Sequence, residues 1–103
     1  MRMLAIFLTL VLTATAAPVA AAQKECVVLL HGLWRSPSSM RVMGDALELA
    51  GYDIVNLGYP STKAPIHELM ETAVTPAVEA CGDAKVHFVT HSMGGILTRA
   101  WLS

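Results

Sequence analysis

The sequence has little positive charge and no run of it. Lysine and arginine number seven among 103 residues, against eight acidic residues, and they lie singly along the chain. This balance provides neither the basic patch that nucleic-acid binding requires nor a polybasic membrane patch, so we expect no nucleic-acid partner. Internal repeats, low-complexity tracts and linkers are also missing, and the length favours one domain at most.

Metal-ligand spacings are missing as well. The four histidines are His31, His67, His87 and His91, and no pair of them has the arrangement of a metal site. A lone histidine on a strand or helix is more often structural than a ligand. We therefore predict neither a metal nor a cofactor.

The first 22 residues are typical of a secretory signal. Arg2 is a short positive start, residues 4–12 form an apolar core, and Ala20-Ala21-Ala22 offers a cleavage site before Gln23. The sequence therefore predicts an exported protein, periplasmic or extracellular, with residues 23–103 as its mature part.

The alternative is an uncleaved membrane anchor. Residues 4–22 carry no charge and are about long enough to span a bilayer. The short apolar core, its interruption by Pro18 and the small residues at the cleavage site favour removal. We expect no stable membrane span after cleavage.

Cysteine occurs only at Cys26 and Cys81. In an exported chain such a pair is a candidate disulfide. Each cysteine precedes an apolar segment that suits a strand, and the starts of neighbouring parallel strands share one sheet edge, so the two could meet. A bridge would constrain the unfolded chain by about 4 kcal/mol in the entropy model. The alternative is two buried free thiols.

Hydrophobic periodicity predicts three strands that alternate with three helices. Short apolar runs indicate strands, Ser36-Pro37 resembles a helix start, and Pro76 should kink or split the second helix. This alternation predicts an α/β fold with a central, mostly parallel sheet and helices on both faces. The expected strands are 27–30, 52–57 and 86–89, and the expected helices are 37–50, 66–80 and 93 onward.

Besides Met93, three methionines lie on the expected helices, at Met40, Met43 and Met70. They could form an apolar surface for a substrate. Methionine fills irregular gaps in protein cores, and we favour that role for all three.

The segment from Val86 to Leu97 carries the strongest functional signal. A buried strand leads to Thr90-His91-Ser92-Met93-Gly94, and a helix follows. A serine at the apex of such a turn forms a nucleophile elbow, which exposes its hydroxyl. Small residues are needed two positions before and two after the serine; Gly94 meets this need better than Thr90. The alternative is a serine that only caps the helix.

Two backbone amides are predicted to form the oxyanion hole. The Met93 N–H would lie at the start of the helix, where the helix dipole adds positive potential. The second donor should come from the loop after the first strand, where Gly32 lets the chain turn close to the substrate. We assign it to Leu33, with Trp34 as the alternate. Met93 and Trp34 are also the expected contributors to an acyl pocket.

The motifs Leu29-Leu30-His31-Gly32 and Val89-Thr90-His91-Ser92-Met93-Gly94-Gly95 resemble the α/β-hydrolase superfamily, in its bacterial lipase-like esterase branch. The resemblance covers nearly all of residues 27–102. It implies a parallel sheet with the Ser92 strand at its middle, and ester hydrolysis through an acyl-serine. In that family the acid and the catalytic histidine follow the nucleophile. We therefore expect residues 23–103 to be the N-terminal part of such a domain, truncated after the nucleophile helix.

None of the histidines is a credible base for Ser92. His91 should point away from its neighbour, His31 should shape the oxyanion loop, and His67 should be exposed. His87 lies lower on its strand, in the core or facing a helix. The aspartates all precede the serine, so none matches the family's acid position; they are Asp45, Asp53 and Asp83.

The predicted function is hydrolysis of carboxylic esters, with a small-molecule or lipid ester as substrate. Alternatives with the same elbow are an acyltransferase, a thioesterase or an amidase, and a further alternative is a non-catalytic binding or interaction fragment. Without a base, we expect very poor hydrolysis of short-chain p-nitrophenyl esters.

Overall fold

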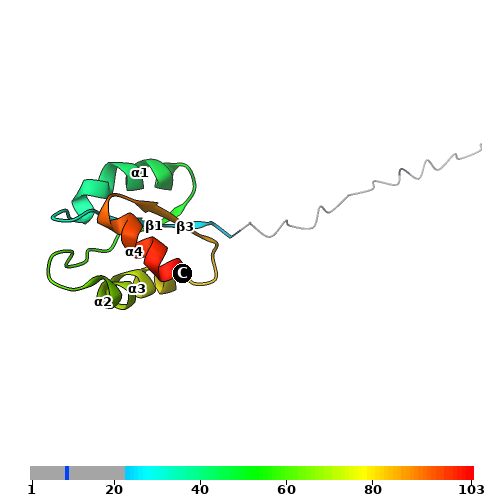
Figure 1. Ribbon diagram of the computed structural model, residues 1–103. Helices are drawn as coiled ribbons and strands as arrows, with labels where there is room; N and C mark the ends of the chain where they lie inside the picture. Colours follow the sequence, from blue (N-terminus) through cyan, green and yellow to red (C-terminus); the bar gives the residue numbers. More distant parts are fainter. Residues whose placement is uncertain (1–8, 10–22) are drawn as a thin grey trace, which may run out of the picture.

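The computed structural model describes residue 9 and residues 23–103 (Figure 1). The predicted signal segment and its cleavage site lie outside the described residues. The elements, in chain order, are β1 (Cys26–Leu30), the 3-10 helix η1 (Pro37–Met40), α1 (Arg41–Leu49), β2 (Asp53–Val55), α2 (Ile66–Leu69), the π-helical turn η2 (Met70–Val74), α3 (Thr75–Ala80), β3 (Val86–Thr90) and α4 (Met93–Leu102).

The three strands form one parallel sheet in the order β2-β1-β3. β1 pairs with β3 along its whole length, from Cys26 opposite Val86 to Leu30 opposite Thr90. All five residues of β1 are buried, as a continuous apolar run in the centre of a parallel sheet requires. The prediction of an α/β arrangement with a parallel sheet is confirmed.

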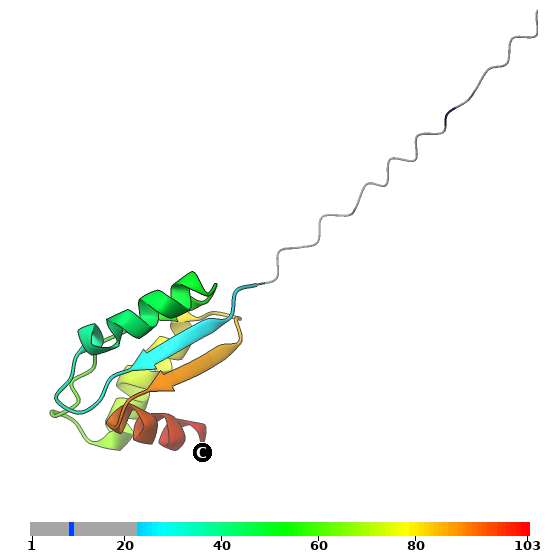
Figure 2. The same cartoon turned by 90° about the horizontal axis from the view of Figure 1, so that it is seen from above.

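Side chains of β1 alternate between two apolar layers, because successive residues of a strand point to opposite faces. Val28 and Leu30 join the larger cluster, together with residues of α2, η2, α3 and α4. Val27 and Leu29 join the smaller cluster, which Met40 completes. Figures 1 and 2 show η1 and α1 on one side of the sheet and α2, α3 and α4 on the opposite side.

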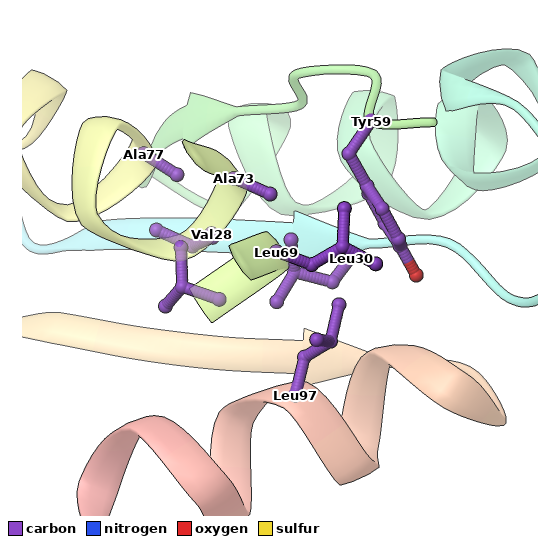
Figure 3. Close-up of a cluster of buried hydrophobic side chains, with 8 residues drawn as sticks. Val28, Leu30, Tyr59, Leu69, Ala73, Ala77 and Leu97 are labelled. Carbon is purple, nitrogen blue, oxygen red and sulfur yellow. The ribbon is translucent and has the colours of Figure 1, made fainter. Parts of the chain in front are cut away.

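The larger cluster connects the sheet to segments far apart in the sequence. Figure 3 shows Leu97 of α4 and Leu69 of α2 converging on Leu30, with Ala73 and Ala77 beside Val28. Tyr59, from the loop after β2, reaches the same cluster. Burial of these side chains fixes the carboxyl end of β1 against the start of α4.

Pro76 divides the second helical stretch, as predicted. A proline has no N–H for the Thr72 carbonyl four residues earlier, so the regular helix ladder cannot pass through this point. The chain adopts the wider turn η2 immediately before it, and the Thr75 hydroxyl donates to the Met70 carbonyl at 3.3 Å.

Several local expectations were wrong. The second strand is shorter than 52–57, because Asn56 leaves the sheet edge and its side-chain amide donates to the Pro37 carbonyl at 2.9 Å. Met43 is not a core residue: 48% of its side chain is exposed on the outer surface of α1. The helix start at Ser36-Pro37 is confirmed, with Ser36 as the N-cap of η1 and Pro37 as its first residue, although the Ser36 hydroxyl contacts the Ser38 hydroxyl at 2.6 Å and makes no capping hydrogen bond.

A disulfide joins Cys26 to Cys81 at the amino end of the sheet, with the two Cα atoms 5.7 Å apart. Cys26 begins β1, and Cys81 follows α3, shortly before β3. The bridge therefore ties the central strand to the helices that cover one of its faces. Among the described residues, no helix is long and apolar enough to cross a membrane.

Candidate active site

Ser92 occupies a strained turn between β3 and α4. Its φ of 52° and ψ of -117° lie in a region that residues with side chains seldom adopt. The amides of Gly94 and Gly95 close the turn by donating to the carbonyls of His91 at 3.1 Å and Ser92 at 2.9 Å. Such a backbone costs on the order of 1–3 kcal/mol, and residues like it cluster at functional sites. The serine itself is exposed.

Close packing of α4 against β1 imposes this turn. A Cβ atom at Gly94 would lie 2.4 Å from the Leu30 carbonyl oxygen and 2.9 Å from the Leu30 Cβ. The His91 amide donates to the same Leu30 carbonyl at 3.1 Å. Thr90 fits because it remains in β3 as its last residue. The elbow is therefore anchored on the buried end of the neighbouring strand.

The loop after β1 touches the elbow directly. A Cβ atom at Gly32 would lie 2.7 Å from the His91 Nδ1 and 3.3 Å from the Ser92 Cβ. The loop then turns through Trp34, whose φ is 62°, and the Arg35 amide donates to the Gly32 carbonyl at 3.1 Å. A side chain at position 32 would displace the exposed His91 ring and crowd the His91 carbonyl oxygen and the Ser92 Cβ, each 3.3 Å away.

The two amides predicted as oxyanion donors make no hydrogen bond within the described residues. Within residues 23–103, neither the Leu33 N–H nor the Met93 N–H donates to a carbonyl or a side chain. One lies on the loop that touches Ser92 and the other directly follows Ser92. Their assignment to an oxyanion hole stays a prediction, and their hydrogen-bonding capacity is available for it.

Tyr59 clamps the start of this loop. Its ring stacks on His31 with the centroids 4.2 Å apart, and its hydroxyl donates to the His31 carbonyl. The Tyr59 amide faces the His31 Nε2 at 3.4 Å, and the His31 Nδ1 faces the Gly32 carbonyl at 2.9 Å. These partners assign the ring proton to Nδ1 and leave Nε2 as an acceptor. Burial raises the pKa of Tyr59 above its ordinary value of 10.0, so the hydroxyl remains a donor.

Ser61 adds a second attachment between the same two loops. Its hydroxyl oxygen accepts a hydrogen bond from the Trp34 amide at 3.3 Å. Sequence reasoning missed both Tyr59 and Ser61. Their place after the second strand could have indicated this role. Gly58-Tyr59-Pro60 follows β2, which is parallel to β1, so this segment lies at the same sheet edge as the loop after β1.

The histidines do not reach the serine hydroxyl. Among the described residues, no side chain hydrogen-bonds to the Ser92 Oγ. His31 is buried at the loop, His67 is exposed on α2, and His91 lies exposed beside Gly32. His87 lies low on its strand, as expected, but it is half-buried rather than in the core, and its Nε2 lies 3.3 Å from a Glu25 oxygen.

A cleft of about 330 Å³ borders the elbow, lined by Arg35, Ser39, Met40 and His91. The residues expected to form an acyl pocket do not line it. Trp34 is 81% exposed, and Met93 packs against the larger apolar cluster. Within residues 23–103, the acidic, histidine and cysteine side chains form no group that could hold a metal ion.

Comparison of the chain with known protein families, with curated proteins and with solved structures finds no match. The α/β-hydrolase resemblance therefore depends on the two motifs and on the chemistry of the residues around them.

Proposed function

We propose that this chain carries the nucleophile and the oxyanion hole of an α/β-hydrolase-type serine esterase. The observation that carries the proposal is the backbone of Ser92, at φ 52° and ψ -117° between β3 and α4. A serine that merely capped the helix would need no left-handed backbone, and its hydroxyl would accept a bond from the first helical turn. Ser92 makes no such capping bond.

The proposed reaction is acyl transfer to the serine and then to water. The Ser92 Oγ attacks the ester carbonyl carbon, and the Leu33 and Met93 amides donate to the oxyanion that develops. The Oγ proton passes to a base and from it to the departing alcohol oxygen as the carbon–oxygen bond breaks. Water then cleaves the acyl-serine and restores the hydroxyl.

The base and its acid partner are assigned to polypeptide other than residues 23–103. The exposure of β3 supports this completion. Along the described chain, β3 pairs only with β1, and its apolar residues Val86, Phe88 and Val89 are half-buried, whereas all of β1 is buried. In a larger domain, a further parallel strand would pair with the free edge of β3.

Site-selective modification tests the nucleophile. The chain is treated with a fluorophosphonate, and the adducts are located by mass spectrometry of peptides. We expect an adduct at Ser92 at least about tenfold faster than at the exposed Ser36, because only Ser92 has amide donors for the phosphoryl oxygen. Ser92→Ala should remove the adduct, and Ser36→Ala should leave it unchanged. Equal labelling of the two serines would contradict the proposal.

Turnover tests the missing base. The chain should hydrolyse short-chain p-nitrophenyl esters very poorly, because general-base catalysis contributes about 10²–10⁴-fold. Turnover comparable with that of a complete esterase, abolished by Ser92→Ala, would show that a base acts within this chain.

A further inference from the structure

The cleft beside the elbow has a lining unlike that of a simple acyl pocket. It contains one cation, one hydroxyl, one imidazole and one apolar side chain, from Arg35, Ser39, His91 and Met40. His91 directly precedes Ser92, so a molecule in the cleft lies beside the proposed nucleophile. No acidic side chain is among the lining residues.

The backbone of Arg35 is held by a hydrogen bond, and its guanidinium makes no ion pair within the described residues. Its amide donates to the Gly32 carbonyl at 3.1 Å, which fixes its position relative to the elbow. Across residues 23–103, the ion pairs all involve Glu25, at the opposite end of the sheet, and none involves Arg35. A guanidinium presents paired donors that match the two oxygens of a carboxylate or phosphate.

We propose that this cleft binds an anionic group of the ester substrate. The Arg35 guanidinium pairs with the anion, and Met40 contacts the apolar part of the molecule. The Ser39 hydroxyl borders the cleft but already donates its proton to the Ser36 carbonyl at 2.7 Å, so Arg35 supplies the paired donors. The anion is a carboxylate at the far end of the acyl group or a phosphate on the alcohol. This inference rests on the proposed esterase function for its link to catalysis; the binding itself does not require Ser92 to react.

The test compares charged ligands with neutral ligands of nearly the same shape. Amide and arginine side-chain NMR signals of the ¹⁵N-labelled chain are followed during titration with monomethyl glutarate and with dimethyl glutarate. A second pair, glycerol 3-phosphate and glycerol, examines the phosphate. We expect saturable shifts at Arg35, Ser39 and His91 with at least one charged ligand, and none with its neutral partner. The charged ligand that binds more tightly identifies which oxyanion the substrate carries.

Three variants locate the charge. Arg35→Gln should weaken binding about tenfold or more, a loss that corresponds to about 1.4 kcal/mol. Arg35→Lys should retain part of the affinity, since it keeps the charge but not the paired donors. Arg41→Gln is the matched control, because Arg41 is also exposed but does not line the cleft. Unchanged binding in Arg35→Gln, or equal binding of the neutral ligands, would overturn the proposal.

Ser92→Ala separates this inference from the proposed function. The variant should bind the charged ligand as the unaltered chain does. Binding without selective Ser92 labelling would support the anion site and contradict the nucleophile. Selective labelling at Ser92 without charge-dependent binding would support the nucleophile and contradict the anion site.

Discussion

The two ends of the sheet are stabilised in different ways. At the amino end, a covalent bond joins Cys26 to Cys81, and the polar contacts of Glu25 lie half-exposed around it. At the carboxyl end there is no covalent link; the elbow depends on the close approach of Gly94 to Leu30 and on the Tyr59 clamp. The covalent constraint thus lies away from the proposed chemistry, and noncovalent packing holds the strained serine.

Removing the disulfide should have the largest effect on stability. The double variant Cys26→Ser, Cys81→Ser should lose about 4 kcal/mol of unfolding free energy, because the bridge closes a loop with a sequence separation of 55. Urea denaturation measures the loss. A reductant should destabilise the unaltered chain by a similar amount and leave the variant unchanged. A loss below about 1 kcal/mol would show that the amino end does not depend on its covalent bond.

Gly94→Ala should have the next largest effect, about 3 kcal/mol, because the new methyl group would overlap the backbone of Leu30. Gly95→Ala is the matched control. A Cβ there would meet only the Thr90 side chain, with the Oγ1 at 3.2 Å and the Cβ at 3.9 Å, and alanine is the better helix former. Urea denaturation of both variants makes the comparison. Similar losses in the two would mean that the elbow does not require the close approach at position 94.

Tyr59→Phe should lower the free energy of unfolding by about 1–2 kcal/mol, because the buried His31 carbonyl loses its donor. Tyr52→Phe serves as control, since among the described residues the Tyr52 hydroxyl has no hydrogen-bond partner. A loss of unfolding free energy in Tyr59→Phe no greater than that in Tyr52→Phe would show that the Tyr59 hydroxyl does not stabilise the loop after β1.

The pH dependence of stability gives the Tyr59 prediction a second measurement. Because burial raises the pKa of Tyr59 in the folded state, the unfolded chain releases this proton at a lower pH than the folded chain does. The contribution of Tyr59 is therefore complete below pH 10.0 and is lost as the pH rises through the folded-state pKa. Tyr59→Phe should flatten the decline in stability that begins above pH 10.0.

Glu25→Gln should have the smallest effect, about 0–1 kcal/mol, because its ion pairs with Lys85 and His87 are substantially exposed. The loss should shrink further in high salt. Urea denaturation at low and high ionic strength measures it. A loss as large as that of the disulfide variant would reverse the ranking of contributions at the amino end.

The general architecture could be predicted because it depends on local periodicity. The apolar run of β1 and the spacing of Leu69, Ala73 and Ala77 require only short-range patterns, and the structure contains both elements. Pro76 likewise acts on its own helix. The elbow was predictable for the same reason, since its strand, turn and helix are contiguous.

What the sequence did not reveal depends on contacts between distant segments. Tyr59 and His31 are 28 positions apart, and only the pairing of β2 with β1 brings their loops together. The exposure of Met43 was missed because helical spacing shows which residues share a face of α1 but not how much of that face the sheet covers. Arg35 was missed as a cleft residue because an isolated charge usually faces solvent.

The position of the disulfide also determines which parts of the molecule stay attached after the chain is cut. Cys26 and Cys81 enclose β2, the helices α1, α2 and α3, and both loops of the Tyr59 clamp, while β3, Ser92 and α4 lie outside this ring. A single peptide-bond cleavage at an exposed loop such as 62–63 therefore releases no fragment. The nicked protein would migrate as one species until reduced, whereas a cut between residues 82 and 85 would leave β3, Ser92 and α4 without a covalent link to the rest.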